Sequence, residues 1–410
     1  MIRSLRRLAR FESPTRLDWS VYFGLFTLLH IPAIINFYHR EGDSNPYLLF
    51  AQSLLKGDLR LPSGMSSYMD MIAYHGAYYL PYPPLPSVIL LPFVAIFGVH
   101  HVNTVFIVII MSCLNLYLLY KLLERLKVDQ TWVPWLIIAF FFGSGYWYAL
   151  FTSHHVYAFA QITSCTFQLL FLNEMLGKRR WLLIGILIGC SFLTRQLTIF
   201  YMIFPLGYMW YLYKTEGTPI RIKDLLLLGS GCGFFIALYL LYNYARFGNP
   251  LDPGYAHILF IGTLKERVDR YGVFSIKYFL FNLYTFFIKG FNIEFQGPTL
   301  MQIKDMDLWG TSLLSASPFL IASIRAKWPT ILKTSAWITI VVILLALLCY
   351  HNNGYFQTNT IRFSLDFLPL LFMLTALGIK DINPWLLRSL IAYSIFLNLV
   401  SFVIHFIYHP

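Results

Sequence analysis

The chain has 410 residues, of which 58% are hydrophobic and only 12% are charged, and its formal net charge is +12. The charged share is about half of that found in soluble globular domains, so polar side chains cannot cover the surface, which excludes a soluble protein. The basic residues cluster at the ends of apolar runs, as membrane topology requires, so the positive charge does not indicate a nucleic-acid-binding protein.

Apolar runs of the length that crosses a bilayer, roughly 17–25 residues, recur along the chain. Their length and their lack of alternation predict helices and not a β-barrel. We therefore predict an all-α, polytopic membrane bundle of about 11–13 transmembrane helices. The bundle forms a single domain, residues 1–410, with no separate soluble domain. The predicted spans are Trp19 to Phe37, Pro84 to Val99, Val102 to Leu122, Trp132 to Phe151, Val156 to Leu176, Trp181 to Leu197, Ile199 to Tyr213, Leu225 to Tyr244, Leu308 to Ile324, Ile331 to Tyr350, Phe363 to Gly378 and Pro384 to Ile407.

Basic clusters predict which loops face the cytoplasm. These clusters are the arginine-rich N-terminus, Lys121 to Lys127, Lys178 to Arg180, Lys214 to Lys223, Arg325 to Lys333 and Lys380 to Arg388. The N-terminus and Lys121 lie on one side only if an even number of crossings separates them, yet three apolar segments stand between them. The shortest, Pro84 to Val99, contains Pro84, Pro86 and Pro92, so we predict that it is re-entrant.

Two long polar segments, 38–83 and 246–307, are predicted on the non-cytoplasmic side. Each contains an amphipathic stretch that is expected to lie at the membrane interface as a helix, Pro46 to Lys56 in the first and Phe274 to Lys289 in the second. Chemistry carried out by this chain is expected in these loops.

Asp43 follows the first predicted span directly, so its carboxylate lies at the membrane surface, where it can act as a general base toward an acceptor hydroxyl. The alternative is structural: Asp43 before Pro46 is also a good N-cap for the amphipathic helix.

Several short motifs occur in a specific order. Asp43 is followed four residues later by Tyr47, then by the sequence LLKGD at 54–58 and PPL at 83–85. FGNPL at 247–251, Gly254-Tyr255, SPFL at 317–320 and Arg362-Phe363 before Pro369 come later. This order resembles the protein mannosyltransferase and aminoarabinose transferase superfamily of GT-C glycosyltransferases.

The resemblance covers almost the whole chain and implies an enzyme that transfers a sugar from a polyprenyl-phosphate donor to an acceptor on the non-cytoplasmic face. Asp43 matches the catalytic acidic position of the family. The chain departs from the family where Ser44 follows Asp43, since many members have an Asp-Glu pair there. It departs again at Tyr82 and Pro83, where many members carry a charged residue.

A lipid phosphate needs cations near the membrane surface, and arginine binds phosphate best through its two-pronged guanidinium. Arg195 and Arg362 stand at external span ends, and Lys289 ends the second amphipathic stretch, so these three are the candidate phosphate ligands. Alternatively, each can reach the interface as an ordinary flanking cation, and Arg362 can pair with Asp366 one turn later.

Candidate sugar or acceptor contacts are aromatic and imidazole side chains, since these combine a flat ring with a polar group. They are Tyr47, His75, Tyr79, Tyr82, His154 and His155. For the two neighbouring histidines, a plain interfacial role is the alternative. The external carboxylates are dispersed, which argues against a hard-metal site, and the resembled family members are usually metal-independent, so we expect neither metal nor cofactor.

The predicted function is therefore a lipid-linked sugar transferase, in which Asp43 is the base and arginines bind the phosphate of the donor. Its expected partners are a polyprenyl-phosphate-linked sugar, a lipid, glycan or protein acceptor, and membrane lipids. The expected location is a bacterial inner membrane, with the site facing outward. A secondary transporter, or a flippase or polymerase of lipid-linked glycans, is the alternative.

Overall fold

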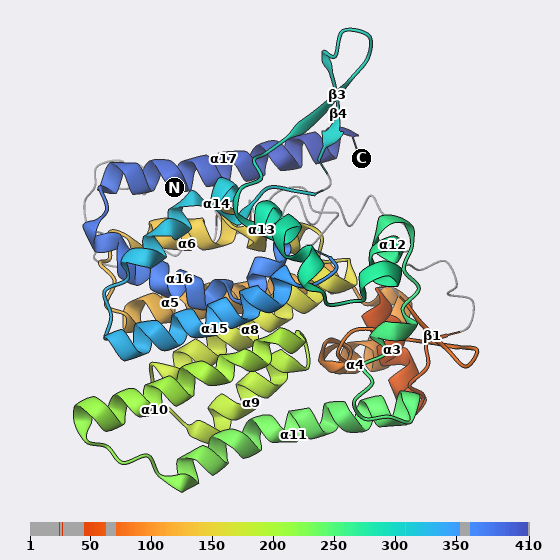
Figure 1. Cartoon of the computed structure of the whole chain (residues 1–410), viewed down its shortest axis with the longest axis horizontal. Coiled ribbons are helices and arrows are strands. Elements are labelled where there is room, and N and C mark those ends of the chain that lie inside the picture. The colour runs from red at the N-terminus through yellow and green to blue at the C-terminus, as the bar shows by residue number, and fades with distance from the viewer. Residues whose placement is uncertain are drawn as a thin grey trace.

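The computed structural model describes Gly24, Thr27 and residues 45–62, 71–307, 309–352 and 361–408, with residues 405–408 described by backbone alone. Asp43 and the first predicted span, apart from the helical Gly24 and Thr27, lie outside the described residues. Most of the described chain is helical, as the sequence predicts (Figure 1).

The helices run in this order: α3 (Pro46–Leu55), α4 (Leu85–Phe97), α5 (Thr104–Arg125), α6 (Val133–Phe142), α7 (Gly145–Phe151), α8 (Val156–Met175), α9 (Trp181–Phe192), α10 (Ile203–Glu216), α11 (Ile222–Phe247), α12 (Gly262–Tyr271), α13 (Phe279–Phe287), α14 (Leu313–Ala316), α15 (Thr330–Leu348), α16 (Leu368–Gly378) and α17 (Pro384–Tyr408). Short 3₁₀ helices lie between them: η1 (Val99–His101), η2 (Gln196–Met202), η3 (Tyr255–His257), η4 (Ile276–Tyr278), η5 (Pro318–Arg325), η6 (Arg362–Asp366) and η7 (Ile379–Asp381).

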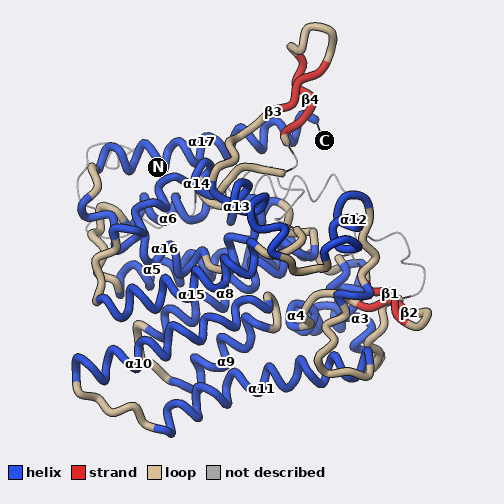
Figure 2. The backbone as a smooth tube through the Cα atoms, viewed as in Figure 1, coloured by secondary structure: helices blue, strands red, loops and turns tan. Residues whose placement is uncertain are grey.

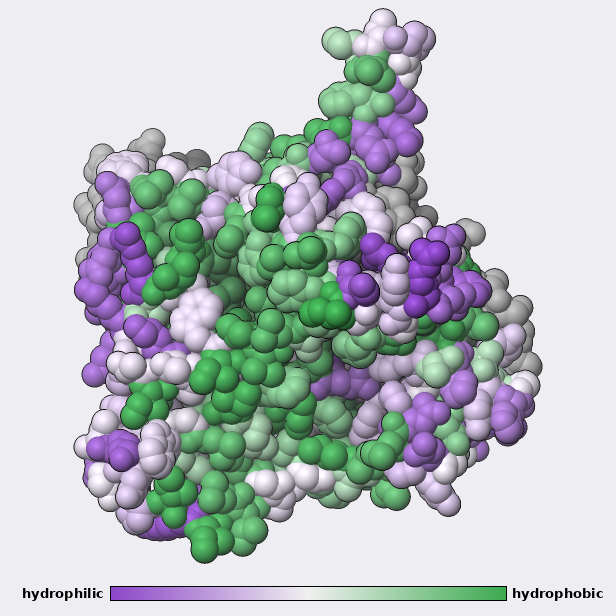
Figure 3. All heavy atoms as spheres, in the orientation of Figure 1, coloured by the Kyte–Doolittle hydropathy of each residue, from purple (hydrophilic) through white to green (hydrophobic). Residues whose placement is uncertain are grey.

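Four described helices, α5, α11, α15 and α17, are long and apolar enough to cross a membrane, and a bent pair, α6 with α7, makes a fifth if it counts as one span. Other predicted spans include the shorter helix α9 and helix α8, which buries polar side chains. The predicted span Leu308 to Ile324 is wrong as a single helix, because its described part holds only the short helices α14 and η5. Apolar residues form a broad band across the middle of the molecule between two hydrophilic edges (Figure 3), and large apolar side chains of α11 are exposed within it. The chain is thus an integral membrane protein.

The predicted span Trp132 to Phe151 is not one straight helix, because α6 and α7 meet at 53°. Ser144 caps α7 by accepting the N–H of Tyr146 (3.2 Å). The carbonyls freed at the break are satisfied from far along the chain: that of Phe142 accepts from Asn398 (2.6 Å) and that of Gly143 from Ser317 (2.6 Å). Polar partners of this kind, which hydropathy does not reveal, allow a helix to break at membrane depth.

Helix α4 occupies the segment predicted to be re-entrant. It has 13 residues with Pro92 inside it, which gives a length of about 20 Å against a hydrocarbon core of about 30 Å. Helix α4 alone is therefore too short to span the membrane, and its re-entrant course stays a prediction.

Two β-hairpins stand in the polar loops, where the sequence pattern predicts none (Figure 2). Strands β1 (Ile72–Tyr74) and β2 (Ala77–Tyr79) are joined by His75 and Gly76, whose positive φ values, 49° and 75°, are those of a type I′ turn. Strands β3 (Ile293–Gln296) and β4 (Gln302–Met306) form the second hairpin, which projects from the body of the molecule in Figure 1. Strands this short give no recognisable alternation in the sequence.

The two polar loops are joined to each other. The N–H of Leu259 donates to the carbonyl of Met71 (2.8 Å), and Ile258 forms an antiparallel bridge with Ile72. Residues that follow α11 therefore extend the first hairpin, and the two loops form one layer over the same end of the bundle.

Helices α9 and α11 pack through facing glycines. A Cβ on Gly185 would lie 2.2 Å from the carbonyl oxygen of Leu228, and one on Gly231 would lie 2.5 Å from that of Leu182. Small residues of this kind let two membrane helices approach closely, and α11 is thereby fixed beside the helix that leads into the site.

Gly185→Ala is expected to lower the thermal unfolding midpoint of the purified protein, because the added methyl meets backbone that cannot move aside, at a cost of about 1–3 kcal/mol. The matched control is Gly229→Ala in α11, where an added Cβ meets no atom within 4 Å. Equal midpoints for the two variants, measured by intrinsic fluorescence in detergent, would contradict this account of the packing.

Candidate active site

The buried polar side of α8 positions the segment that carries Arg362 and Asp366. Gln161 donates to the carbonyl of Arg362 (3.1 Å), and Gln168 donates to that of Leu365 (3.3 Å). Tyr201 in turn donates to Gln168 (2.7 Å). Both glutamines are buried, and buried polar groups are retained where they are hydrogen-bonded. Helix η6 is thus held at both of its ends.

Arg195 and Asp366 form a two-pronged ion pair. Nε and Nη2 of Arg195 each donate to a different oxygen of Asp366, at 2.8 Å. The Asp366 side chain is 1% exposed and that of Arg195 is 16% exposed. Within the described part of the chain, Nη1 of Arg195 makes no hydrogen bond, so part of the guanidinium is available to an anion.

Arg362 lies beside this pair. Its guanidinium carbon is 4.0 Å from the ring centre of Tyr157 and 4.8 Å from that of Phe363. The guanidinium carbon of Arg195 is 5.3 Å from the centre of the same Phe363 ring. The two arginines predicted to bind phosphate therefore gather around one aromatic side chain.

The two structural alternatives for Arg362, a flanking cation at the interface or an ion pair with Asp366, do not match the structure. Arg362 is only 6% exposed, so it does not extend to the interface as a flanking cation. The carboxylate of Asp366 pairs with Arg195 and not with Arg362, because η6 and the segment after α9 bring residues 171 positions apart into contact. An argument from spacing along one helix cannot identify such a partner.

Helix α3 begins next to the same group. Asn45 is its N-cap and accepts the N–H of Tyr47 (3.0 Å), while the Asn45 side-chain amide donates to the carbonyl of His154 (3.0 Å). The alternative in which Asp43 caps this helix is therefore wrong: Asn45 is the cap. Asp43 stands two positions earlier, outside the described residues.

Tyr47 is completely buried, and its hydroxyl has no hydrogen-bond partner among the described residues. Its ring centre lies 6.2 Å from that of Tyr82 and 6.1 Å from that of Phe159. Burial raises the pKa of the Tyr47 phenol, and the positive charge of nearby Arg195 acts in the opposite direction. Tyr47 is thus a neutral hydroxyl at the arginine group.

The two histidines lie at the start of α8, where the His154 and His155 ring centres are 4.0 Å apart. His155 stacks on Tyr157 (5.3 Å), the ring that Arg362 covers. Asn45 at the start of α3 and Arg362 are therefore connected through these aromatic rings.

The other residues predicted to contact sugar, acceptor or phosphate lie away from the arginine group. His75 is exposed in the turn of the first hairpin and stacks on Tyr74, while Tyr79 packs edge-on against Phe247 (5.5 Å). Lys289 is paired with Asp307 at the base of the second hairpin. Among the described residues, His75, Tyr79 and Lys289 make no contact with Arg195 or Arg362. The binding roles of these three residues stay predictions.

Two further residues connect the loops to the site: Tyr255 stands in the Gly254-Tyr255 motif, and Arg246 directly precedes FGNPL. Tyr255 donates to Gln196 (2.7 Å), which also donates to Tyr239, so the second loop is fixed to the residue after Arg195. Arg246 is 5% exposed and donates to the carbonyl of Leu80 (2.7 Å), which ties α11 to the first loop. The order of the motifs is the signal that pointed to them.

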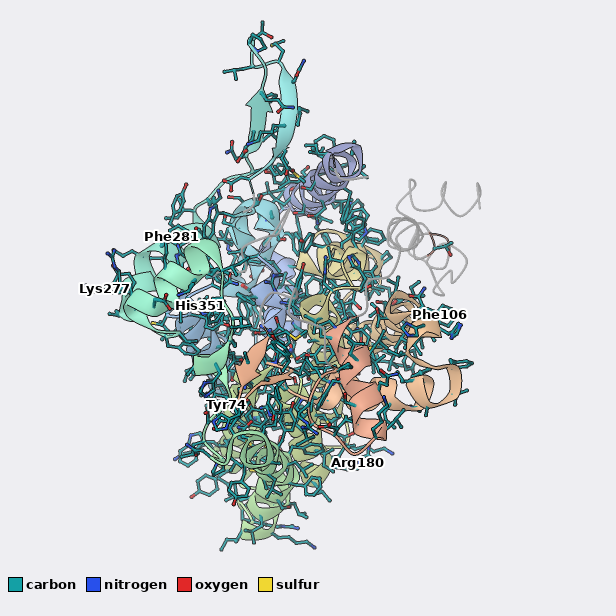
Figure 4. All side chains as sticks on the ribbon, turned by 90° about the vertical axis from the view of Figure 1, so that its right-hand side faces the viewer. Tyr74, Phe106, Arg180, Lys277, Phe281 and His351 are labelled. Carbon is teal, nitrogen blue, oxygen red and sulfur yellow. The ribbon has the colours of Figure 1, made fainter. Side chains whose placement is uncertain are left out.

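His351 follows α15 at the external end. Its side chain is 1% exposed, its backbone N–H donates to the carbonyl of Val273 (2.9 Å), and its carbonyl accepts from Arg267 (3.1 Å). Figure 4 places it between Phe281 of α13 and Tyr74 of β1. Burial, together with the charge of Arg267, lowers the pKa of His351 to about 4.

Within the described ranges, no three His, Cys, Asp or Glu side chains gather in a way that could hold a metal ion.

Residues 82–244 match the family described as dolichyl-phosphate-mannose-protein mannosyltransferase. No curated protein matches the chain. Two crystal structures of ArnT from Cupriavidus metallidurans have a similar fold, one bound to undecaprenyl phosphate and one in the apo state, with TM-scores of 0.52 and 0.50 and 13% identity in each. The alignments cover 89% and 91% of this chain and 61% of the ArnT chain.

The fold is therefore the ArnT-like GT-C fold, in an integral membrane protein. The family match and the shared fold together confirm the resemblance to the GT-C glycosyltransferase superfamily. The matched stretch includes Arg195 and ends well before Arg362.

Asp366→Asn is expected to destabilise the protein by about 3–5 kcal/mol, because it leaves the largely buried Arg195 charge without its partner. The double variant Arg195→Gln/Asp366→Asn is expected to recover much of the thermal midpoint, because it removes the buried charge together with its partner. Thermal unfolding of both variants in detergent is the measurement, and a double variant no more stable than Asp366→Asn would contradict this account.

His351 is expected to make stability fall with acid. Its folded pKa of about 4 lies below the unfolded value of about 6.5, so the unfolded state binds the proton more tightly. The contribution is present above pH 6.5 and is lost as the pH falls toward 4. The thermal midpoint of His351→Gln should therefore drop less between pH 7 and pH 5 than that of the unmodified protein. An equal drop would show that other groups dominate.

Proposed function

We propose that the chain is a membrane glycosyltransferase that moves a sugar from a polyprenyl-phosphate donor to an acceptor on the non-cytoplasmic face. The observation that carries this proposal is the pair of guanidinium groups of Arg195 and Arg362 around Phe363, in a largely buried place beneath the external loops. A dianionic or diester phosphate is the ligand that two adjacent arginines fit best.

In this mechanism Asp43 removes or orients the proton of the acceptor hydroxyl, which then attacks the anomeric carbon of the donor sugar. The bond from that carbon to the phosphate oxygen breaks, and negative charge develops on the leaving lipid phosphate. Arg195 and Arg362 stabilise that charge. Their orientation is fixed in advance by Asp366 and by the rings of Tyr157 and Phe363, so little reorganisation is needed during the reaction.

A lipid donor is supported by the ArnT structure, which is bound to undecaprenyl phosphate and shares the fold. The family match, with its polyprenyl-phosphate sugar in the family description, supports the same donor class. The basic clusters, which predict the cytoplasmic loops, support an outward-facing site, and a bacterial inner membrane is proposed as its location.

Sugar or acceptor binding is proposed for Tyr47, Tyr82, His154 and His155, which lie next to the arginine group. His75 and Tyr79, on the hairpin above, are proposed for the more distant part of the acceptor. The buried hydroxyl of Tyr47 is a hydrogen-bond donor that needs a partner, and a phosphate or sugar oxygen supplies one.

A transporter is less well supported. Broken helices in transporters coordinate ions with freed carbonyls, whereas the carbonyls at the break between α6 and α7 are occupied by Asn398 and Ser317. The break is therefore structural.

Asp43→Asn is expected to reduce sugar transfer by roughly 10²–10⁴-fold, the usual contribution of a general base, while binding of the lipid donor is retained. Asp58→Asn is the matched control, because Asp58 lies in the same loop in an exposed pair with Arg60, and it should keep nearly full activity. Transfer is measured from a radiolabelled lipid-linked sugar in proteoliposomes, and binding by retention of the same donor.

Unchanged transfer by Asp43→Asn would remove the catalytic assignment of Asp43. If the unmodified protein transferred no sugar from any lipid-linked donor and instead moved a lipid across the bilayer, the proposal of a transferase would be overturned.

A further inference from the structure

A polar cavity lies at the other end of α8 from the candidate site. Its volume is about 320 Å³, and it is lined by Tyr117, Leu118, Lys121, Glu124, Arg125 and Asn173. Asn173 is 18 residues beyond His155 at the start of α8, roughly 27 Å along a helix, so the cavity opens near the opposite membrane surface. The basic clusters predict that this surface is cytoplasmic.

Arg125 is the charged group of this cavity that lies outside the ion pairs of the described residues. It makes no hydrogen bond or ion pair among the described residues. The two nearby acids are occupied: Glu124 pairs with Lys121 (2.8 Å), and Glu174 pairs with Arg180 (2.8 Å). Glu174 also interacts electrostatically with Arg125, but three cations, Lys121, Arg125 and Arg180, stand against two acids, so the group keeps a net positive charge beside the cavity.

Arg125 is exposed, but its guanidinium lies against Gly177. A Cβ on Gly177 would lie 2.2 Å from Nη1 of Arg125, so the guanidinium occupies the space that any side chain at position 177 would fill. Glycine at the end of α8 therefore lets the guanidinium lie against the backbone with its N–H groups beside the cavity.

Asn173 supplies a polar atom at the cavity that lacks a hydrogen-bond partner. Its amide nitrogen donates to the carbonyls of Leu118 and Leu169 (both 2.9 Å), but its Oδ1 is buried and accepts no hydrogen bond among the described residues. The Asn173 side chain is 8% exposed. A buried acceptor without a donor is costly, and a ligand hydroxyl would satisfy it.

The outer surface of α5 continues from the cavity as an apolar stripe. Phe106, Ile110, Leu114 and Tyr117 succeed one another at helical spacing and are 62%, 53%, 41% and 49% exposed (Phe106 is labelled in Figure 4). An acyl chain lying along this stripe would bring its headgroup to Tyr117 and Lys121.

We propose that this cavity binds the headgroup of an anionic glycerophospholipid, with the phosphate against Arg125 and a headgroup hydroxyl donating to Asn173 Oδ1. Phosphatidylglycerol has this chemistry. A zwitterionic phosphatidylethanolamine fits less well, because its ammonium would need a free acid and both nearby acids are paired. Basic pockets between membrane helices are known to bind lipid headgroups in this way.

The test is native mass spectrometry of the purified, delipidated full-length protein with equimolar phosphatidylglycerol, phosphatidylethanolamine and phosphatidylcholine of identical acyl chains. The unmodified protein should retain one phosphatidylglycerol preferentially. Arg125→Gln should reduce that preference by about fivefold or more, as expected for one arginine at a membrane surface. Gly177→Ala should reduce it as well, since it displaces the guanidinium and keeps its charge.

The control is Lys327→Gln, which removes a charge from an exposed pair with Asp381 on the same predicted membrane side, and it should leave the preference unchanged. An equal loss in Lys327→Gln would show that diffuse charge attracts the lipid, and preference for phosphatidylethanolamine would contradict the charge argument. Displacement of the lipid by millimolar inorganic phosphate would assign the cavity to free phosphate. Each of these results would overturn the proposal. Monodisperse elution of every variant confirms folding.

Discussion

The ion pair between Arg195 and Asp366 is the interaction on which the arrangement of the site depends. It joins the segment after α9 to η6, two parts of the chain that are far apart in sequence. Burying two charges costs several kcal/mol for each ion, and the attraction between them offsets this only with good geometry. The pair is therefore a weak source of stability. Its value lies in fixing where the guanidinium of Arg195 points.

Helix α8 makes that geometry possible. Its polar residues face the interior, where Gln161 and Gln168 hold η6, and its first residue stands next to His155. Because the buried side of this helix carries hydrogen-bonding side chains, α8 is not among the helices apolar enough to cross a membrane, although its 20 residues are sufficient in length.

The sequence predicts the helical membrane fold, the two polar loops and the arginines, because hydropathy and charge at span ends are local properties. It does not predict the break between α6 and α7 or the partner of Asp366, because both depend on contacts between distant residues. The first hairpin is an intermediate case. Its His75-Gly76 turn is a local signal, but strands of three residues carry too little pattern to be recognised.

Pairing Arg195 with an acid has a consequence for how the site can treat phosphate. The pair has no net charge, so it attracts a ground-state phosphodiester less than a free arginine would. In the proposed reaction its fixed N–H groups still stabilise the charge that develops on the phosphate as the bond to the sugar breaks, because orientation and not net charge decides that contribution. Interactions that strengthen only in the transition state raise the rate, whereas uniform binding does not. In the proposed mechanism Arg195 therefore contributes oriented N–H donors to the chemical step, beside an Arg362 that stacks on Tyr157.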